Sequence, residues 1–208
     1  MEVGNLAQWA SAVMSAVVAT LAVWGDKVRT WLAGPQIELF LRAGRGDLNF
    51  RADSKKALYH HIVVRNRRSW SPAKDVRLQI VGLAKRGPDG TFFPESLVTP
   101  LQLTWAFPFA HEQLPTVAST DTCDLGFLDE EGARFRLTTY VIPNNFRGFV
   151  AAGKAMRVEV VASASNFSSR EPLTIEVSWD GKWTDLEEMQ RHLVIKEVAP
   201  GDDPRGRR

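Results

Sequence analysis

The chain contains few histidines and cysteines, the side chains that supply nitrogen and sulfur ligands to metals. Its four histidines are His60, His61, His111 and His192, and its only cysteine is Cys123. A metal site needs several such ligands converging on one point. His60 and His61 are adjacent in a predicted strand, so they point to opposite faces and cannot both serve one ion. We therefore predict no metal site and interpret the histidines as ordinary core or surface residues.

A catalytic nucleophile is not evident in the sequence either. Cys123 lies at the start of a predicted strand, where a lone cysteine usually acts as a small buried apolar residue, although a histidine partner need only meet it in space. The carboxylates of Asp129, Glu130 and Glu131 fall in a predicted hairpin turn, which favours acidic residues because it is solvated. The sequence also contains no phosphate-binding glycine loop and no nucleophile elbow. We predict a protein that is not an enzyme, with no catalytic residues and no cofactor.

One basic cluster has the composition of a binding site. Arg65, Arg67 and Arg68 flank Asn66 in a predicted turn, and Trp70 follows closely. Arginines beside an aromatic ring suit a phosphate or a nucleotide. The same turn, if it lies near a membrane, suits anionic lipid headgroups. A third interpretation is a solvated turn without a ligand, and the sequence leaves all three open.

The overall composition limits the partners. The chain has 208 residues and a formal net charge of +2. This length allows one anchor and one domain of ordinary size. The charge is too small to indicate nucleic acid, which we do not expect as a partner. A single cysteine excludes an intrachain disulfide, which fits a reducing compartment without establishing one.

The amino-terminal segment 6–24 is apolar and contains no charged residue. As a helix it is about long enough to cross a bilayer. Trp9 and Trp24 lie near its ends, and Trp31 follows in a charged continuation, all at places where aromatic rings favour the membrane interface. We predict one transmembrane helix within an anchor of residues 1–33.

Three alternatives to a membrane anchor remain open. The segment could be a cleaved signal peptide, a helix packed on the soluble domain, or a helix that assembles with copies of itself in solution. Ser11, Ser15 and Ala19 form a row of small residues, which allows close approach of helices in lipid. Homo-oligomerisation through the anchor is therefore a hypothesis, although an alanine-rich helix contains such rows by chance.

The flanking charges predict the orientation of the anchor. Lys27, Arg29, Arg42 and Arg45 all follow the helix, whereas Glu2 precedes it. Basic flanks stay on the cytoplasmic side. We predict a single-pass protein of the inner (plasma) membrane, with its amino terminus outside and its domain in the cytoplasm.

Beyond Gly34-Pro35 the apolar residues alternate, as they do in half-buried strands. Strands are predicted over 36–41, 58–65, 73–83, 155–163, 173–179 and 193–198, with a short one near 101–105 and a hairpin of 122–128 and 133–142. A short helix is predicted over 185–191. The domain is predicted to span 34–198, followed by a disordered tail over 199–208.

This pattern predicts a mainly β fold, an antiparallel sandwich preceded by one transmembrane helix. The segment 64–78 carries Val64-x-Asn66, a short turn and Pro72-Ala73-x-x-Val76-x-Leu78. It resembles one hairpin of bacterial immunoglobulin-like domains of the cell-adhesion-related type. The resemblance implies an immunoglobulin-like fold and no activity. Domains of that type are usually shorter than 36–198 and usually exported.

Two functions fit these observations. The first is a membrane-anchored, non-enzymatic binding or scaffold protein whose β-sandwich binds another protein or a ligand in the cytoplasm. The alternative is a ligand-regulated membrane effector, in which the sandwich senses a small anionic molecule such as a nucleotide and the anchors rearrange in the bilayer.

Overall fold

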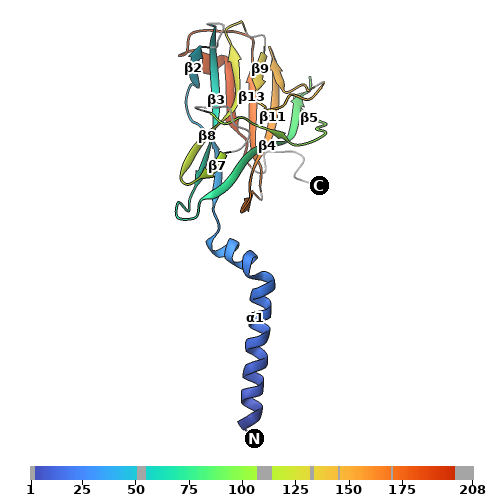
Figure 1. The fold of residues 1–208 in the computed structure, drawn as a ribbon. Coiled ribbons are helices and arrows are strands. Elements are labelled where there is room, and N and C mark those ends of the chain that lie inside the picture. The colour runs from blue at the N-terminus through green and yellow to red at the C-terminus, as the bar shows by residue number, and fades with distance from the viewer. Residues whose placement is uncertain are drawn as a thin grey trace.

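The computed structural model describes residues 3–50, 55–106, 114–131, 134–144, 146–169 and 171–199. A long helix, α1 (Val3–Ala33), projects from one end of a mainly β domain (Figure 1). The domain consists of antiparallel sheets, as the alternating sequence pattern predicted. The helix ends before Gly34-Pro35, because proline cannot continue a helix.

The strands form two sheets. The first is six-stranded, in the order β1 (Ile37–Leu41), β3 (Lys56–Asn66), β8 (Thr120–Asp129), β9 (Arg134–Leu137) and β10 (Phe149–Ala151), with β2 (Asp47–Phe50) also paired to β3. The second is eight-stranded, in the order β14 (Leu193–Glu197), β13 (Leu173–Trp179), β11 (Lys154–Ala164), β4 (Ala73–Arg86) and β5 (Phe92–Glu95). In this sheet β12 (Phe167–Ser168) pairs with β11, whereas β6 (Leu101–Gln102) and β7 (Leu114–Val117) pair with β4. A one-turn helix, α2 (Met189–His192), precedes β14.

Both sheets contribute to one hydrophobic core. In β3 the side chains of Ile62 and Val64 are fully buried, and in β4 those of Val76, Leu78 and Ile80 are too. These buried residues recur at every second position, because successive side chains of a strand point to opposite faces. The alternation read from the sequence therefore decides which face of each sheet is inside.

The predicted strands over 36–41, 58–65, 73–83, 155–163, 173–179 and 193–198 are confirmed within a few residues. The predicted hairpin is confirmed as β8 paired with β9, but β9 ends at Leu137 rather than at residue 142. The predicted short strand is β6, and Leu103 and Trp105 follow as isolated bridges. The predicted helix over 185–191 is the shorter α2.

Five of the strands described here were not predicted: β2, β5, β7, β10 and β12. Each has only two to four residues, and β5 and β7 contain Pro94 and Pro115. Such pieces are too short to show a period and are selected by pairing partners far away in the chain.

The segment that resembles an immunoglobulin-like domain does not form a hairpin. It contains the end of β3 and the start of β4, which lie in different sheets. The turn between Asn66 and Ala73 therefore carries the chain from one sheet to the other. The expectation of paired strands was wrong, because the sequence of a turn does not show which strands pair.

Helix α1 stands clear of the β domain (Figure 1). Its apolar side chains are exposed, by 69% at Trp9, 61% at Val18 and 57% at Trp24. Over the residues described here, no helix combines the length and apolar character that crossing a bilayer requires. The side chain of Trp31 and residues 200–208 of the predicted tail lie outside the described residues.

Candidate functional site

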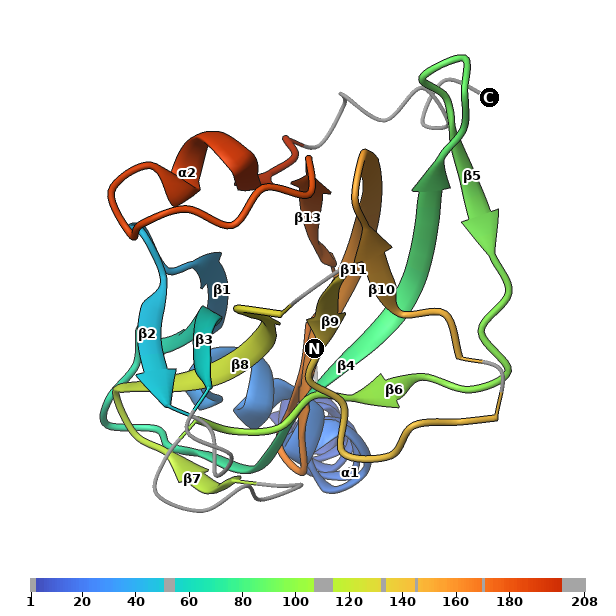
Figure 2. The same cartoon turned by 90° about the horizontal axis from the view of Figure 1, so that it is seen from above.

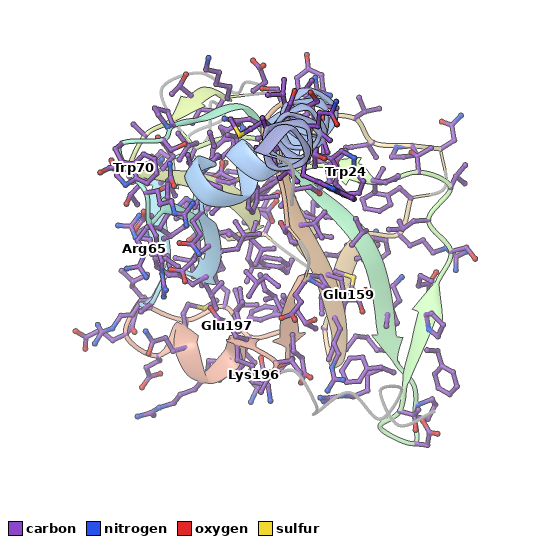
Figure 3. All side chains as sticks on the ribbon, turned by 90° about the horizontal axis from the view of Figure 1, so that it is seen from below. Trp24, Arg65, Trp70, Glu159, Lys196 and Glu197 are labelled. Atoms are coloured by element: carbon purple, nitrogen blue, oxygen red, sulfur yellow. The ribbon has the colours of Figure 1, made fainter. Side chains whose placement is uncertain are left out.

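The predicted arginine turn lies where α1 joins the β domain. The guanidinium Nη1 of Arg68 donates a hydrogen bond to the carbonyl of Gly34 (3.0 Å), directly after α1. The backbone N–H of Arg67 donates to the carbonyl of Gln36 (2.9 Å). Figure 3, seen along α1 from below, shows Arg65 and Trp70 on one flank of the domain. The structure therefore brings the turn to the same end as the helix.

The charges of this turn are partly balanced within the protein. The carboxylate of Glu38 forms ion pairs with both Arg65 (2.9 Å) and Arg67 (2.6 Å). The hydrogen bond from Arg65 is the main cause that lowers the pKa of Glu38, and Arg67 adds to it. Arg68 lies 5.7 Å from the ring centre of Trp70, whose side chain is 67% exposed. The turn thus presents cations and one exposed aromatic ring on a protruding surface.

A second polar region, which the sequence did not reveal as a site, surrounds His60 and His61. Strands β1 and β2 follow each other along the same edge of β3, pairing Leu41 with Ile62 and Asp47 with Tyr59. The loop 42–46 therefore bulges out opposite the two histidines. On the other edge of β3, the pairing with β8 shifts register at the same two residues. Such irregularities re-aim side chains and are frequent beside functional sites.

Both histidines are buried, with 8% of each exposed. His61 contacts Asp124 through Nδ1 at 2.7 Å and Asp47 through Nε2 at 3.1 Å. The pKa of His60 is lowered to about 4, mainly because burial disfavours the charged form, with a further contribution from His61 that Asp47 opposes. His60 is therefore neutral at pH 7. The prediction of ordinary core histidines agrees with this burial but did not anticipate the irregular backbone around them.

A cavity of about 300 Å³ opens beside His60. Its walls are the loop 42–45 on one side and, on the other, Met189 and Gln190 of α2 and Leu193, Val194 and Ile195 of β14. A smaller hollow of about 90 Å³ on the other side of the loop touches both His60 and His61. Figure 2, from above, shows α2 beside β1 and β2, with α1 on the far side of the domain. The cavity therefore lies at the end opposite the arginine turn.

Arg45 and Gln190 are the polar wall residues that the sequence reading missed. In the sequence, Arg42 and Arg45 were interpreted as part of the basic flank of the helix. The run 42–46 does contain a signal for a tight loop, because Gly44 lies between Arg42 and Arg45 and Gly46 follows them. Both glycines have positive φ, +129° at Gly44 and +78° at Gly46. Only the pairing of β1 and β2 with the same neighbour places this loop over His60.

The structure also places the remaining chemical candidates. Cys123 is buried, its Sγ donates to the carbonyl of Thr104 (3.1 Å), and burial raises the pKa of its thiol. The expectation of a small buried residue is confirmed. Glu131 in the acidic turn pairs with Lys55 at 2.7 Å on the surface. Among the residues described, no three metal-binding side chains converge.

A buried carboxylate, Glu176, was also missed. It is 4% exposed and lies 3.1 Å from Arg157, 2.7 Å from Arg86 and 3.6 Å from Lys196. Figure 3 shows Lys196 at the β14 side of this sheet. Phe92 lies between the two guanidinium groups, 4.1 Å from Arg157 and 5.0 Å from Arg86. Because every charge here has a partner, we interpret the cluster as a structural tie across β4, β11, β13 and β14.

The chain was also compared with known proteins. No family model matches it, and neither a curated protein nor a solved structure shows significant similarity to it.

Proposed function

We propose that this is a non-enzymatic binding or scaffold protein that α1 holds at a membrane, with its β-sandwich in the cytoplasm. The observation that carries the proposal is the exposure of apolar side chains along α1, by 56% at Val13, 64% at Met14 and 46% at Val17. An apolar surface of this kind needs lipid or a protein partner to cover it. The uncharged sequence over 6–24 favours lipid.

The arginine turn supports the same arrangement. It lies at the end of the domain from which α1 projects, and the side chains of Arg65 and Arg67 are 50% and 58% exposed. With Trp70 beside them, these cations suit anionic headgroups of the cytoplasmic leaflet. The turn would then be a second membrane contact and not the site of a soluble ligand.

The direct test is fractionation of the full chain beside a variant that lacks residues 1–33. We expect the full chain in the membrane fraction and the truncated chain in the supernatant. Val17→Asp places a charge in the middle of the apolar segment, where it costs about 3 kcal/mol of insertion free energy, and should release the protein. Val98→Asp is the matched control, because Val98 is 98% exposed in a loop of the domain and the variant should stay in the membrane.

Orientation is tested by trypsin added to intact spheroplasts and to inverted vesicles. A cytoplasmic domain is cleaved only in inverted vesicles. A full chain that stays soluble would overturn the membrane proposal and leave assembly of α1 with copies of itself as the explanation. Cleavage in intact spheroplasts would overturn the orientation alone.

A second candidate function is the ligand-regulated membrane effector, which the cavity beside His60 favours. In this function, a ligand in the domain changes how several copies of α1 associate in the bilayer. The row of Ser11, Ser15 and Ala19 suits such contacts. Release of a vesicle-trapped dye on addition of a ligand separates this function from a passive scaffold.

A further inference from the structure

We propose that the cavity beside His60 binds a small organic anion, with the acidic group at Arg45 and the apolar part of the molecule inside the cavity. This site deepens the second candidate function, but binding itself does not depend on a membrane. It lies away from the arginine turn, at the opposite end of the domain (Figures 1 and 2).

The loop that forms one wall is larger than sheet pairing requires. Residues 42–46 stand opposite only His60 and His61 on β3. At Gly46, a Cβ atom would lie 2.8 Å from the carbonyl oxygen of Tyr59 and 2.9 Å from Nε2 of His60. Only glycine allows the loop to lie this close to β3. The backbone of the loop is therefore shaped around the His60 ring.

His60 provides a polar group that the fold leaves unused. Its Nε2 is buried and has no hydrogen-bond partner among the described residues. A buried polar atom without a partner has lost its hydration and gained no hydrogen bond in return, which favours a ligand that supplies one. The nitrogen lies against Gly46, which lines the smaller hollow and not the cavity, so a ligand in the cavity reaches it only when the loop moves. A bound acid would then accept a hydrogen bond from the neutral imidazole.

The charges around the cavity favour an anion. Arg42 is engaged by Asp47 at 2.8 Å. Arg45 lies 3.5 Å from Glu187, and these two side chains are 50% and 82% exposed. Such an exposed pair contributes little to stability, so an acid in the less solvated cavity can replace Glu187 as the partner of Arg45.

A third carboxylate near the cavity is already occupied. Glu197 accepts a hydrogen bond from the backbone N–H of Leu41 (2.6 Å). Arg45 is therefore the cation of this region whose partner is most easily exchanged.

The other walls require an apolar part in the ligand. Leu58, Met189 and Leu193 line the cavity, and all three are buried. A volume of about 300 Å³ holds a molecule at the small end of the usual range for organic ligands. Nucleoside monophosphates and aromatic carboxylic acids have this size and this combination of groups. Inorganic phosphate lacks the apolar part.

The test is isothermal titration calorimetry on the full chain in maltoside micelles, with adenosine 5′-monophosphate and indole-3-acetate as probes. We expect at least one probe to bind with a dissociation constant below about 1 mM, and inorganic phosphate or adenosine alone to bind more weakly. Arg45→Ala should weaken binding about tenfold. Gln190→Trp should remove binding, because residue 190 is exposed at the mouth of the cavity and tolerates a larger side chain.

Arg191→Ala is the matched control. It removes an exposed cation from α2 that does not line the cavity, and binding should persist. In parallel, the imidazole resonances of His60 should shift on titration, while those of His192 should not. Two results overturn the proposal: no heat and no His60 shift with either probe, or binding that neither Arg45→Ala nor Gln190→Trp changes. Binding without dye release from vesicles would overturn the effector function and leave the site.

Discussion

The side-chain amide of Asn66 donates a hydrogen bond to the carbonyl of Ser71, with a nitrogen–oxygen distance of 2.8 Å. Its side-chain oxygen accepts from the backbone N–H of Gln36 (3.0 Å) and of Arg68 (3.1 Å). Asn66 is 4% exposed. One buried side chain therefore joins the start of the domain to the turn that carries the chain from one sheet to the other. This role requires both an amide donor and an amide acceptor, which explains an asparagine at position 66.

Replacing Asn66 tests this role. Asn66→Ala leaves the part-buried backbone N–H groups of Gln36 and Arg68 without their acceptor, and we expect a loss of about 1–3 kcal/mol in the free energy of unfolding. Urea unfolding of the full chain, followed by tryptophan fluorescence, measures the change. Asn49→Ala is the control, because Asn49 is exposed and its side-chain oxygen accepts from the backbone N–H of its neighbour Phe50. Equal losses in both variants would contradict the role of Asn66.

The buried carboxylate Glu176 should matter far more than a surface one. Glu176→Gln leaves Arg157, whose side chain is 13% exposed, without its countercharge. We expect destabilisation of about 3 kcal/mol. Glu131→Gln breaks the exposed pair with Lys55 and should cost under about 1 kcal/mol. The thermal unfolding midpoints of the two variants, measured side by side, test this expectation: Glu176→Gln should lower the midpoint far more than Glu131→Gln. Similar shifts would rule out a structural tie at Glu176.

His60 makes the stability depend on pH. Its pKa in the folded protein is about 4, against 6.5 for an ordinary histidine, because burial disfavours the charged ring. The unfolded chain therefore binds more protons between these values, so stability falls as the pH drops from 6.5 towards 4. The loss approaches roughly 3 kcal/mol at the lower end.

Urea midpoints at pH 7.0 and pH 5.0 measure this loss. His60→Gln should reduce the difference between the two values. Asn49→Ala changes no titratable group and should leave the difference as it is in the parent chain. If the difference between the urea midpoints at the two pH values is unchanged in His60→Gln, groups other than His60 cause the loss of stability.

Cys123 should be chemically inert while the domain is folded. The thiol is fully buried, and burial raises its pKa, so the reactive thiolate is scarce. Iodoacetamide at pH 8 should leave the native chain unmodified and alkylate the urea-unfolded chain within minutes, as intact mass measures. Rapid alkylation of the native chain would show that β8 opens.

The sequence alone determined the class of the fold and most of its long strands. Alternation at Val76, Leu78 and Ile80 reads as a half-buried strand because the pleat places every second side chain inside, whatever the partner strand is. The helix stop at Gly34-Pro35 is also local, because proline cannot continue a helix whatever surrounds it. The absence of a catalytic motif is likewise a reading of the sequence, and it led to the prediction of a non-enzymatic protein.

Only the tertiary structure decided which elements meet. The sequence placed Arg65 and Arg67 in a turn, but their common partner Glu38 lies on another strand, and the position of the turn beside α1 depends on contacts with Gly34 and Gln36. The cavity required more: Arg45, His60 and Gln190 are far apart in the chain and converge through the pairing of β1 and β2 with β3 and the packing of α2. Residue patterns encode which face of a strand is buried, whereas pairing is selected by the packing of the whole core. A site assembled from three separate segments follows from that pairing together with the packing of α2.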